Sequence, residues 1–242
     1  MDNLILIPAR GGSTRVKNKN IKLLGSVPLI CHSILTSLEV PNSRVIVSSD
    51  DDEIISVSEK YGAETPFKRP DKISKYDSPS IDVIMHTLKW LKENEKYEPK
   101  LVIFKPPTNP FISSDSINKM IEIIKNDNLL SSIVSITKPI SHPFKSVSLD
   151  GEGFLDNSLV SINGKNINDF EMSQEWPECY EGSPACRISR VDYFKKLNLD
   201  SKIPPKTYNV ENAKGFLISN QEAIDIDEED DFNRAEILLK NL

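Results

Sequence analysis

The stretch NLILIPARGGSTRVKNKN, residues 3–20, joins a short apolar run to a loop with two glycines and four Lys or Arg side chains. An apolar run that ends at a proline predicts a first strand, and the loop after it allows two interpretations. One is a targeting signal, but LILI is short for the apolar part of a signal peptide, and the basic residues follow it instead of preceding it. The other is a loop that holds an anion at the end of the first strand, and this one is retained.

Strand-like and helix-like segments then alternate through the first 140 residues. Apolar and β-branched runs predict strands, and apolar residues at helical spacing predict amphipathic helices. The predicted strands cover residues 3–9, 44–50, 101–107 and 131–137, and the predicted helices cover 28–40, 52–63, 80–95 and 114–127. This alternation predicts a doubly wound α/β fold, with helices on both faces of a mostly parallel sheet and ligands at the carboxyl ends of the strands.

The composition changes from residue 139. Residues 139–180 are rich in Pro, Gly, Ser and Asn, and short alternating runs predict hairpins. We interpret this segment as an inserted β-rich arm, of a kind that often pairs two subunits, within a single domain of residues 1–242. Core-like segments follow at 184–189 and 222–227, with helices predicted at 191–199 and 228–242.

The amino-acid composition narrows the kinds of ligand and the cellular compartment that we expect for this protein. The formal net charge of −6 argues against a general nucleic-acid binder, so the basic loop favours a small anion over a polyanion. The longest apolar runs fall well short of the roughly 20 residues that a membrane span needs. Three scattered cysteines, Cys31, Cys179 and Cys186, fit neither a zinc cage nor a disulfide framework. We therefore expect reduced thiols, a cytoplasmic protein and no membrane or nucleic-acid partner.

The basic loop has the residue types that a phosphate needs. Glycines at 11 and 12 let backbone N–H groups approach oxyanions, and a serine hydroxyl adds a donor. Neither common phosphate-loop motif is present, so a solvated basic turn is an equal alternative. The candidate contacts are Arg10, Gly11, Gly12, Ser13, Arg15 and Lys19.

The segment IDID, residues 224–227, is the second candidate site. If residues 223–227 form a strand, Asp225 and Asp227 point to one face and the isoleucines face the core. Paired carboxylates suit Mg²⁺, which prefers a few carboxylates together with phosphate oxygens and water. The alternative is that the acidic cluster only caps the terminal helix. For SSDDDE, residues 48–53, we favour this capping explanation over a metal site.

IPARGGSTRVKNKNI closely resembles the N-terminal signature of the cytidylyltransferases that activate sialic acid and related 2-keto-3-deoxy sugar acids. Further blocks resemble that family in its order and spacing along nearly the whole chain: RVIVSSDDDEI, YGAETPFKRP, SIDVIMHTLKWL, PPTNPF, SIVSIT and IDIDEEDDFNRAE. The resemblance implies a nucleotidyltransferase fold, CTP as co-substrate, Mg²⁺ and a homodimer.

The resemblance also implies roles for single residues. Arg10, Ser13, Lys19 and Asn20 match the positions that hold CTP, and Arg69 matches the contact to the cytosine base. Ser80 is a weaker nucleotide contact and is also explained as a helix N-cap. Asp225 and Asp227 match the metal ligands, so the catalytic set is Arg10, Lys19 and Asp227. Relatives often carry Lys where this chain has Thr14, and Arg15 is expected to supply that charge.

Two blocks depart from the family pattern, and both concern the sugar-acid pocket. KPPTNPFIS, residues 105–113, lacks the usual Gln and Arg around its centre, and SPACRI, residues 183–188, replaces a block of different composition. The expected acceptor contacts are Lys105, Thr108, Arg187 and, from the arm of a partner subunit, Lys145. The three histidines, His32, His86 and His142, do not cluster in sequence, and the first two are expected to pack within helices.

The function that follows is CMP transfer from CTP to the anomeric hydroxyl of a sialic-acid-like 2-keto-3-deoxy sugar acid, with release of pyrophosphate. Two alternatives remain at this point. One is a nucleotidyltransferase that acts on a different sugar or a sugar phosphate. The other is a catalytically silent CTP-binding dimer.

Overall fold

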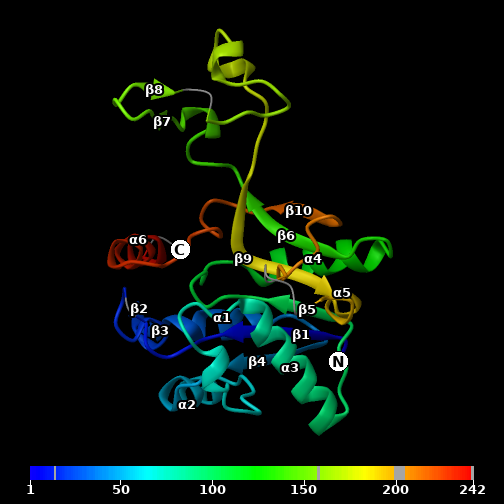
Figure 1. The fold of residues 1–242 in the computed structure, drawn as a ribbon. Coiled ribbons are helices and arrows are strands. Elements are labelled where there is room, and N and C mark those ends of the chain that lie inside the picture. Colours follow the sequence, from blue (N-terminus) through cyan, green and yellow to red (C-terminus); the bar gives the residue numbers. More distant parts are fainter. Residues whose placement is uncertain (14, 157–158, 199–204, 241–242) are drawn as a thin grey trace.

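A six-stranded sheet forms the centre of the molecule (Figure 1). The computed structural model describes residues 1–13, 15–156, 159–198 and 205–240. The strands of this sheet are β1 (Asn3–Pro8), β4 (Ser43–Ser48), β5 (Leu101–Phe104), β6 (Ser132–Thr137), β9 (Glu181–Arg190) and β10 (Ala213–Leu217). Their order is β10-β6-β9-β5-β1-β4, and β9 runs antiparallel to its neighbours β5 and β6, whereas the other described pairs are parallel. The predicted mostly parallel sheet is confirmed.

Helices cover both faces of this sheet, as the doubly wound prediction requires. The helices are α1 (Leu29–Leu38), α2 (Asp52–Lys60), α3 (Ser80–Glu95), α4 (Ser114–Asn126), α5 (Val191–Lys195) and α6 (Glu229–Leu239). Buried side chains of α1, α2 and α4 share one core cluster with the sheet, and those of α3 and α5 share a second cluster. Among the described residues, none of these helices combines the length and the apolar character that a membrane span needs.

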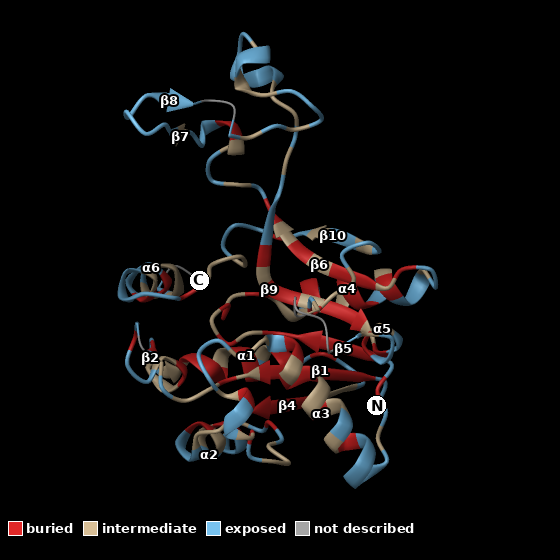
Figure 2. Ribbon diagram, in the orientation of Figure 1, coloured by how far each residue is buried: buried red, intermediate tan, exposed pale blue. Residues whose placement is uncertain are grey.

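Successive side chains of β1 point to opposite faces of the sheet, so its apolar run contributes to two core clusters. Ile5 and Ile7 belong to the cluster with α1 and α4, whereas Leu4 and Leu6 belong to the cluster with α3 and α5. Successive side chains of a strand point to opposite faces, so a strand covered on both faces must be apolar throughout. Figure 2 shows the central strands as buried and the outer faces of the helices as exposed. The loop that follows β1 is therefore anchored to the most enclosed part of the fold.

The segment between β6 and β9 projects from the sheet as an arm (Figure 1). It holds a ladder of β7 (Ser148–Leu149) with β8 (Leu155–Asp156) and 3-10 turns at Pro143–Lys145, Ile167–Asp169 and Ser173–Glu175. The arm has a small aromatic core in which Phe144, almost fully buried, contacts Phe170 and Trp176. The described part is less β-rich than predicted, because Asn, Asp and Pro side chains favour turns over ladders.

The predicted strand at 223–227 is wrong. Residues 221–223 form a turn, and 224–227 run extended without a ladder partner among the described residues. The predicted burial of the isoleucines is nevertheless correct, since Ile226 is fully buried and Ile224 packs beside it in a third cluster with Phe232 of α6. The missed strand is β10, whose Lys214 and Gly215 weaken the strand signal. A second small ladder, β2 (Leu23–Leu24) with β3 (Val27–Pro28), lies near α6.

Candidate active site

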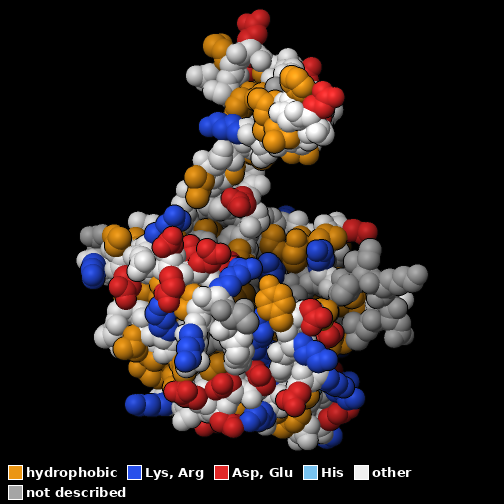
Figure 3. Space-filling model, turned by 60° about the vertical axis from the view of Figure 1, so that its left-hand side comes forward, with side chains coloured by type: hydrophobic (Ala, Val, Ile, Leu, Met, Phe, Trp, Pro, Cys, Tyr) orange, Lys and Arg blue, Asp and Glu red, His pale blue; other side chains and the backbone are white. Residues whose placement is uncertain are grey.

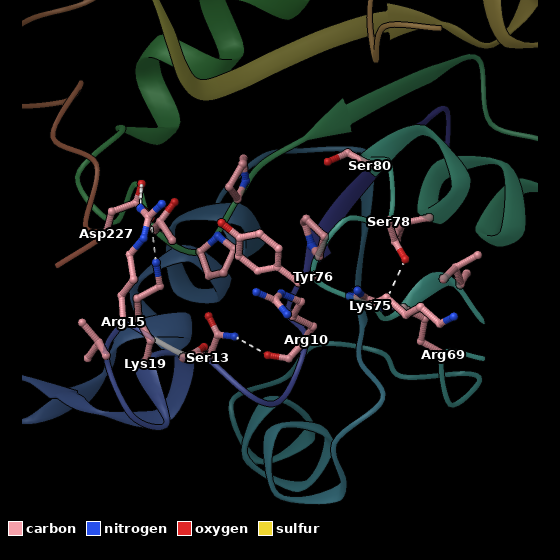
Figure 4. Close-up of a pocket in the computed structure, with 18 residues that line it drawn as sticks. Arg10, Ser13, Arg15, Lys19, Arg69, Lys75, Tyr76, Ser78, Ser80 and Asp227 are labelled. Carbon is pink, nitrogen blue, oxygen red and sulfur yellow. Dashed lines mark hydrogen bonds and ion pairs between the residues drawn. The ribbon is translucent and has the colours of Figure 1, made fainter. Parts of the chain in front are cut away.

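A cleft of about 490 Å³ opens where β1, β4 and β5 end. In Figure 4, Arg15, Lys19 and Asp227 lie at one end of it, Arg69 and Ser80 lie at the other, and Arg10 lies between. The cleft is lined by Pro8, Arg10, Ser13, Arg15, Val16, Lys19, Asn20, Arg69, Ile73, Lys75, Tyr76, Ser78, Ser80, Val83, Pro106, Pro107, Thr108 and Asp227. Most of the nucleotide-binding residues expected from the sequence therefore lie together. Figure 3 shows Lys and Arg side chains gathered on one face beneath the arm.

The glycine loop after β1 is held by polar contacts from two directions. The Gly11 N–H donates to Asp50 Oδ1 at 3.0 Å, and a Cβ at this position would lie 2.9 Å from Asp51 Oδ2. Gly12 has φ +64°, in the left-handed region that favours glycine. From the other side, the buried Asn20 donates from Nδ2 to the Arg10 carbonyl at 2.9 Å. Asn20 thus shapes the loop as well as lining the cleft.

Three cleft residues with polar side-chain groups escaped the sequence analysis. Lys75, Tyr76 and Ser78 come from the segment between the 3-10 turn Asp71–Ile73 and α3. The Arg10 guanidinium carbon lies 5.2 Å from the centre of the Tyr76 ring, within the range of a cation–π contact. KYDSPS carries no phosphate-binding or metal-binding motif, so only the fold brings it to the cleft.

Asp227 pairs with two cations of the glycine loop. Lys19 Nζ lies 2.9 Å from Asp227 Oδ1 and 2.8 Å from the Ile226 carbonyl, and Arg15 Nη1 lies 3.5 Å from Asp227 Oδ2. The Lys19 side chain is mostly buried, with 14% exposed, whereas 53% of the Asp227 side chain is exposed. One carboxylate therefore joins the first loop of the chain to a loop near its end.

Asp225 lies behind Asp227 and outside the cleft lining. Burial raises the pKa of its carboxyl, a hydrogen bond with Thr108 lowers it, and the charge of Asp227 raises it again. Its Oδ1 is buried and has no hydrogen-bond partner among the described residues. Among the described residues, no group of three or more acidic, His or Cys side chains is arranged to hold a metal ion, but Mg²⁺ on a nucleotide needs only one or two carboxylates. The pair thus fits Mg²⁺, with one oxygen left to coordinate.

Arg69 is a buried side chain at the other end of the cleft, although a lone Arg before a Pro usually lies at the surface. Its Nε donates to Ser48 Oγ at 3.1 Å and its Nη2 donates to the Ser48 carbonyl. Burial lowers its pKa to about 10, while the charge of Asp50 opposes this and the charge of Arg10 adds to it. The guanidinium has five N–H donors, so donors remain for a ligand. Ser80 is the first residue of α3 and the cap position is Pro79, so the N-cap explanation for Ser80 is wrong.

The acidic residues of 48–53 stabilise the local structure around α2, as the capping explanation predicts. Asp51 caps α2 by accepting hydrogen bonds from the backbone of Glu53 and Ile54, and Asp52 pairs with Lys68 at 2.7 Å. His32 contacts the Leu24 carbonyl at 3.0 Å, and His86 packs edge-to-face with Phe67, with ring centroids 4.7 Å apart. These helical histidines pack within the structure as expected.

Comparison with known proteins agrees with this geometry. Residues 4–167 match the family model described as Cytidylyltransferase. The chain is 32% identical to the CMP-N,N'-diacetyllegionaminic acid synthase of Campylobacter jejuni, over 99% of this chain and 96% of that protein. This chain belongs to the cytidylyltransferase family. It is therefore a CTP-dependent nucleotidyltransferase.

Two further relatives support the family and the fold. The cytidylyltransferase is 28% identical to the CMP-N,N'-diacetyllegionaminic acid synthase of Legionella pneumophila, over 98% of this chain and 96% of that one. It shares its fold with a structure of CMP:2-keto-3-deoxy-manno-octonic acid synthetase complexed with CTP. That likeness has a TM-score of 0.72 at 15% identity and covers 100% of this chain and 99% of the other.

Lys105 of the cytidylyltransferase lies in the core and not in the cleft. It follows Phe104, which pairs with Arg187 across β5 and β9, so the register sets Lys105 beside Cys186. Both side chains are fully buried, and Lys105 Nζ has no hydrogen-bond partner among the described residues. Burial lowers the pKa of this amine to about 7 and raises the pKa of the Cys186 thiol to about 12. An enclosed amine does not reach a ligand, so the structure gives no support to the predicted acceptor contact.

The other three expected acceptor contacts are separated within one chain. Thr108 lines the cleft, and Arg187 lies half-buried beside Tyr208 with its Nη1 3.4 Å from Thr207 Oγ1. Lys145 is exposed on the arm. Burial lowers the pKa of Arg187, and the charges of Tyr208, Cys186 and Asp225 oppose this. Arg187 is therefore within electrostatic range of Asp225.

The buried amine of Lys105 predicts a pH-dependent stability. Above pH 7 the folded chain releases the Lys105 proton, whereas the unfolded chain keeps it until about 10.5. The unfolded state then binds more protons, so the free energy of unfolding should rise with pH, by at most ~1.4 kcal/mol per pH unit. Urea unfolding between pH 7 and 8.5 measures this slope and stays below the ordinary thiol pKa of 9.0.

Lys105→Met should remove this slope and be more stable than the wild type at pH 7. Lys60→Met, on the exposed side of α2, is the matched control and should keep the wild-type slope. Equal slopes for the wild type and Lys105→Met would contradict the assignment of a neutral buried amine.

Proposed function

We propose that this cytidylyltransferase transfers CMP from CTP to the anomeric hydroxyl of a sialic-acid-like 2-keto-3-deoxy sugar acid. The observation that carries the proposal is the cleft that Arg10 lines and in which Arg15 and Lys19 pair with Asp227. The anomeric hydroxyl attacks the α-phosphorus and releases its proton to solvent, the bond from this phosphorus to the bridging oxygen breaks, and pyrophosphate leaves. Such a transfer depends mainly on positioning and on stabilising charge.

The two ends of the cleft suit the two ends of CTP. Arg69 and Ser80 would bind the cytosine, because a guanidinium fork matches the base O2 and N3 acceptors. The Gly11 N–H already donates to Asp50. The Gly12 N–H, the Ser13 hydroxyl and the side chains of Arg10, Arg15, Lys19 and Asn20 would hold the triphosphate and ribose. Arg10 and Lys19 would stabilise the departing pyrophosphate, because cations aimed at developing charge lower the barrier.

Asp225 and Asp227 would hold Mg²⁺. The buried Oδ1 of Asp225, which has no hydrogen-bond partner in the described part of the chain, and the half-exposed carboxylate of Asp227 would supply the hard oxygen ligands that this ion prefers. When bound, Mg²⁺ would neutralise the triphosphate and polarise the reacting groups. Before CTP enters, Lys19 and Arg15 balance the charge of Asp227. After it enters, both cations can turn to phosphate oxygens.

The acceptor is proposed to be a nine-carbon sugar acid. Two relatives that match nearly the whole chain are CMP-N,N'-diacetyllegionaminic acid synthases. Thr108 at the floor of the cleft and Arg187 near Asp225 would contact the sugar acid, and Lys145 from the arm of a second subunit would reach its carboxylate. Arg binds carboxylates through paired N–H groups, which suits the acidic acceptor.

A panel of acceptors tests this proposal. With CTP and Mg²⁺, we expect pyrophosphate release with unphosphorylated eight- or nine-carbon 2-keto-3-deoxy acids and none with sugar phosphates. Turnover with sugar phosphates alone would indicate a different nucleotidyltransferase. CTP binding without turnover on any acceptor would indicate a catalytically silent protein.

Asp227→Asn should lower turnover by at least about 100-fold, because it removes a metal-binding charge worth several kcal/mol in the transition state. The far-ultraviolet circular dichroism spectrum should stay unchanged, since the side chain is half-exposed. Asp230→Asn, in the exposed first turn of α6, is the control and should keep wild-type turnover. Near-normal activity of Asp227→Asn would overturn the metal assignment.

We further propose that the arm, residues 139–180, pairs two copies of the chain in the cytoplasm. The arm exposes seven large apolar side chains: Ile140, Val147, Leu149, Phe154, Leu155, Leu159 and Met172. Figure 3 shows hydrophobic side chains at the surface of the arm's far end. Exposed apolar groups in this density are typical of an interface. The free thiols Cys31, Cys179 and Cys186 agree with a reducing compartment.

The double variant Phe154→Asp, Leu155→Asp should convert the dimer to a monomer, because two charges would be buried in an apolar contact. Light scattering coupled to size-exclusion chromatography measures the mass. Leu129→Asp, on an apolar residue of the main body that is even more exposed, should leave the dimer intact. A wild-type protein that elutes as a monomer would contradict the proposal that the arm pairs two copies of the chain.

A further inference from the structure

Glu222 binds two separate segments through its carboxylate, three residues before Asp225. Its Oε1 accepts hydrogen bonds from the Ser113 backbone N–H at 3.1 Å and the Ser113 hydroxyl at 2.8 Å. The same oxygen accepts from the Ser116 hydroxyl at 2.6 Å. Its Oε2 accepts from the backbone N–H and the hydroxyl of Ser219, both at 3.2 Å. Both oxygens are therefore engaged, one by each segment.

These contacts fasten the turn at 219–222 to the first turn of α4. Ser113 is the N-cap of this helix, so the carboxylate also lies near the positive end of the helix dipole. Burial would raise the pKa of Glu222, yet the hydrogen bonds from Ser116 and Ser113 hold it below its ordinary value. The group is thus held as a carboxylate in a half-buried place.

The acidic segment after Glu222 depends on such attachments, because 224–227 has no strand partner among the described residues. Asn109 Nδ2 donates to the Ile224 carbonyl at 3.0 Å, and the Ile226 N–H donates to the Thr108 carbonyl at 2.8 Å. The Asp227 N–H donates to Asp231 Oδ2 at 3.0 Å. Glu222 is the point where this tethered segment begins.

We propose that Glu222 is a positioning residue for the two aspartates, which sets where their carboxylates meet Mg²⁺ and CTP. This inference rests on the proposed function, and in particular on Asp225 and Asp227 as metal ligands. Glu222 itself touches neither the nucleotide cleft nor Asp227, so it acts through the backbone of 222–227. Partners that orient metal ligands from behind typically change metal affinity or activity by 10–100-fold.

The test compares Glu222→Ala, Glu222→Gln and the charge-matched control Glu211→Ala, at an exposed residue before β10. Mn²⁺ serves as the probe, and electron paramagnetic resonance measures its binding in the presence of CTP. Isothermal titration with CTP in a chelator measures metal-free binding, and kcat and KM are measured with the acceptor that the wild type uses. We expect Glu222→Ala to weaken Mn²⁺ binding by about 10–100-fold and to lower kcat, with metal-free CTP binding unchanged. Glu222→Gln keeps an accepting carbonyl and should recover part of both losses, and Glu211→Ala should match the wild type.

Unchanged Mn²⁺ affinity in Glu222→Ala would overturn the proposal. An equal loss of metal-dependent and metal-free CTP binding would also overturn it, since that pattern indicates a general loss of structure. If Glu222→Ala does not fold, Ser116→Ala removes one donor and should show a smaller, metal-selective loss, and wild-type Mn²⁺ affinity in that variant would count against the role. A wild type that turns over no acceptor would refute the proposed function, while the Mn²⁺ comparison would still decide on Glu222.

Discussion

The ion pair between Lys19 and Asp227 joins two loops that lie 208 residues apart in the chain, and the cleft depends on it. Arg10, Arg15 and Lys19 repel one another, so an empty cleft needs a nearby negative charge. Asp227 supplies it, but half of its side chain is exposed, and exposed pairs are worth only about 0–1 kcal/mol. So weak an ion pair can hold the two loops together in the empty cleft. A bound polyphosphate can still replace Asp227 as the partner of the cationic side chains.

Unlike the half-exposed ion pair, buried charged groups around the cleft lower the stability of the fold. They are kept where the site needs a fixed geometry. Arg69 is nearly enclosed and Asp225 has a buried oxygen without a partner among the described residues. Each would be more stable in water, so each indicates a place where the fold is adapted to a ligand. Arg69 lines one end of the cleft, and Asp225 lies two residues before Asp227, which lines the other end.

The sequence predicts the sheet and helices well because their signals are local. The limits of α3 match those predicted, as residues 80–95 carry a regular apolar period. The predicted strand at 223–227 fails because an extended loop with one deeply buried isoleucine, Ile226, produces the same alternation as a strand. Lys105 could not be foreseen either, since a lysine usually indicates exposure. Tyr76 reaches the cleft only through the folding of a segment without a motif.

The two blocks that depart from the family pattern are separate in sequence but adjacent in the fold. Phe104 pairs with Arg187, so KPP and SPACRI face each other across β5 and β9. Along β9, Cys186 belongs to the core cluster beside Lys105, whereas Arg187 lies on the opposite side of the strand near Tyr208. A replacement at one block therefore changes the packing of the other, and we interpret both departures as one local adaptation. Its core side accommodates a buried amine, and its outer side places the guanidinium of Arg187 beside Tyr208.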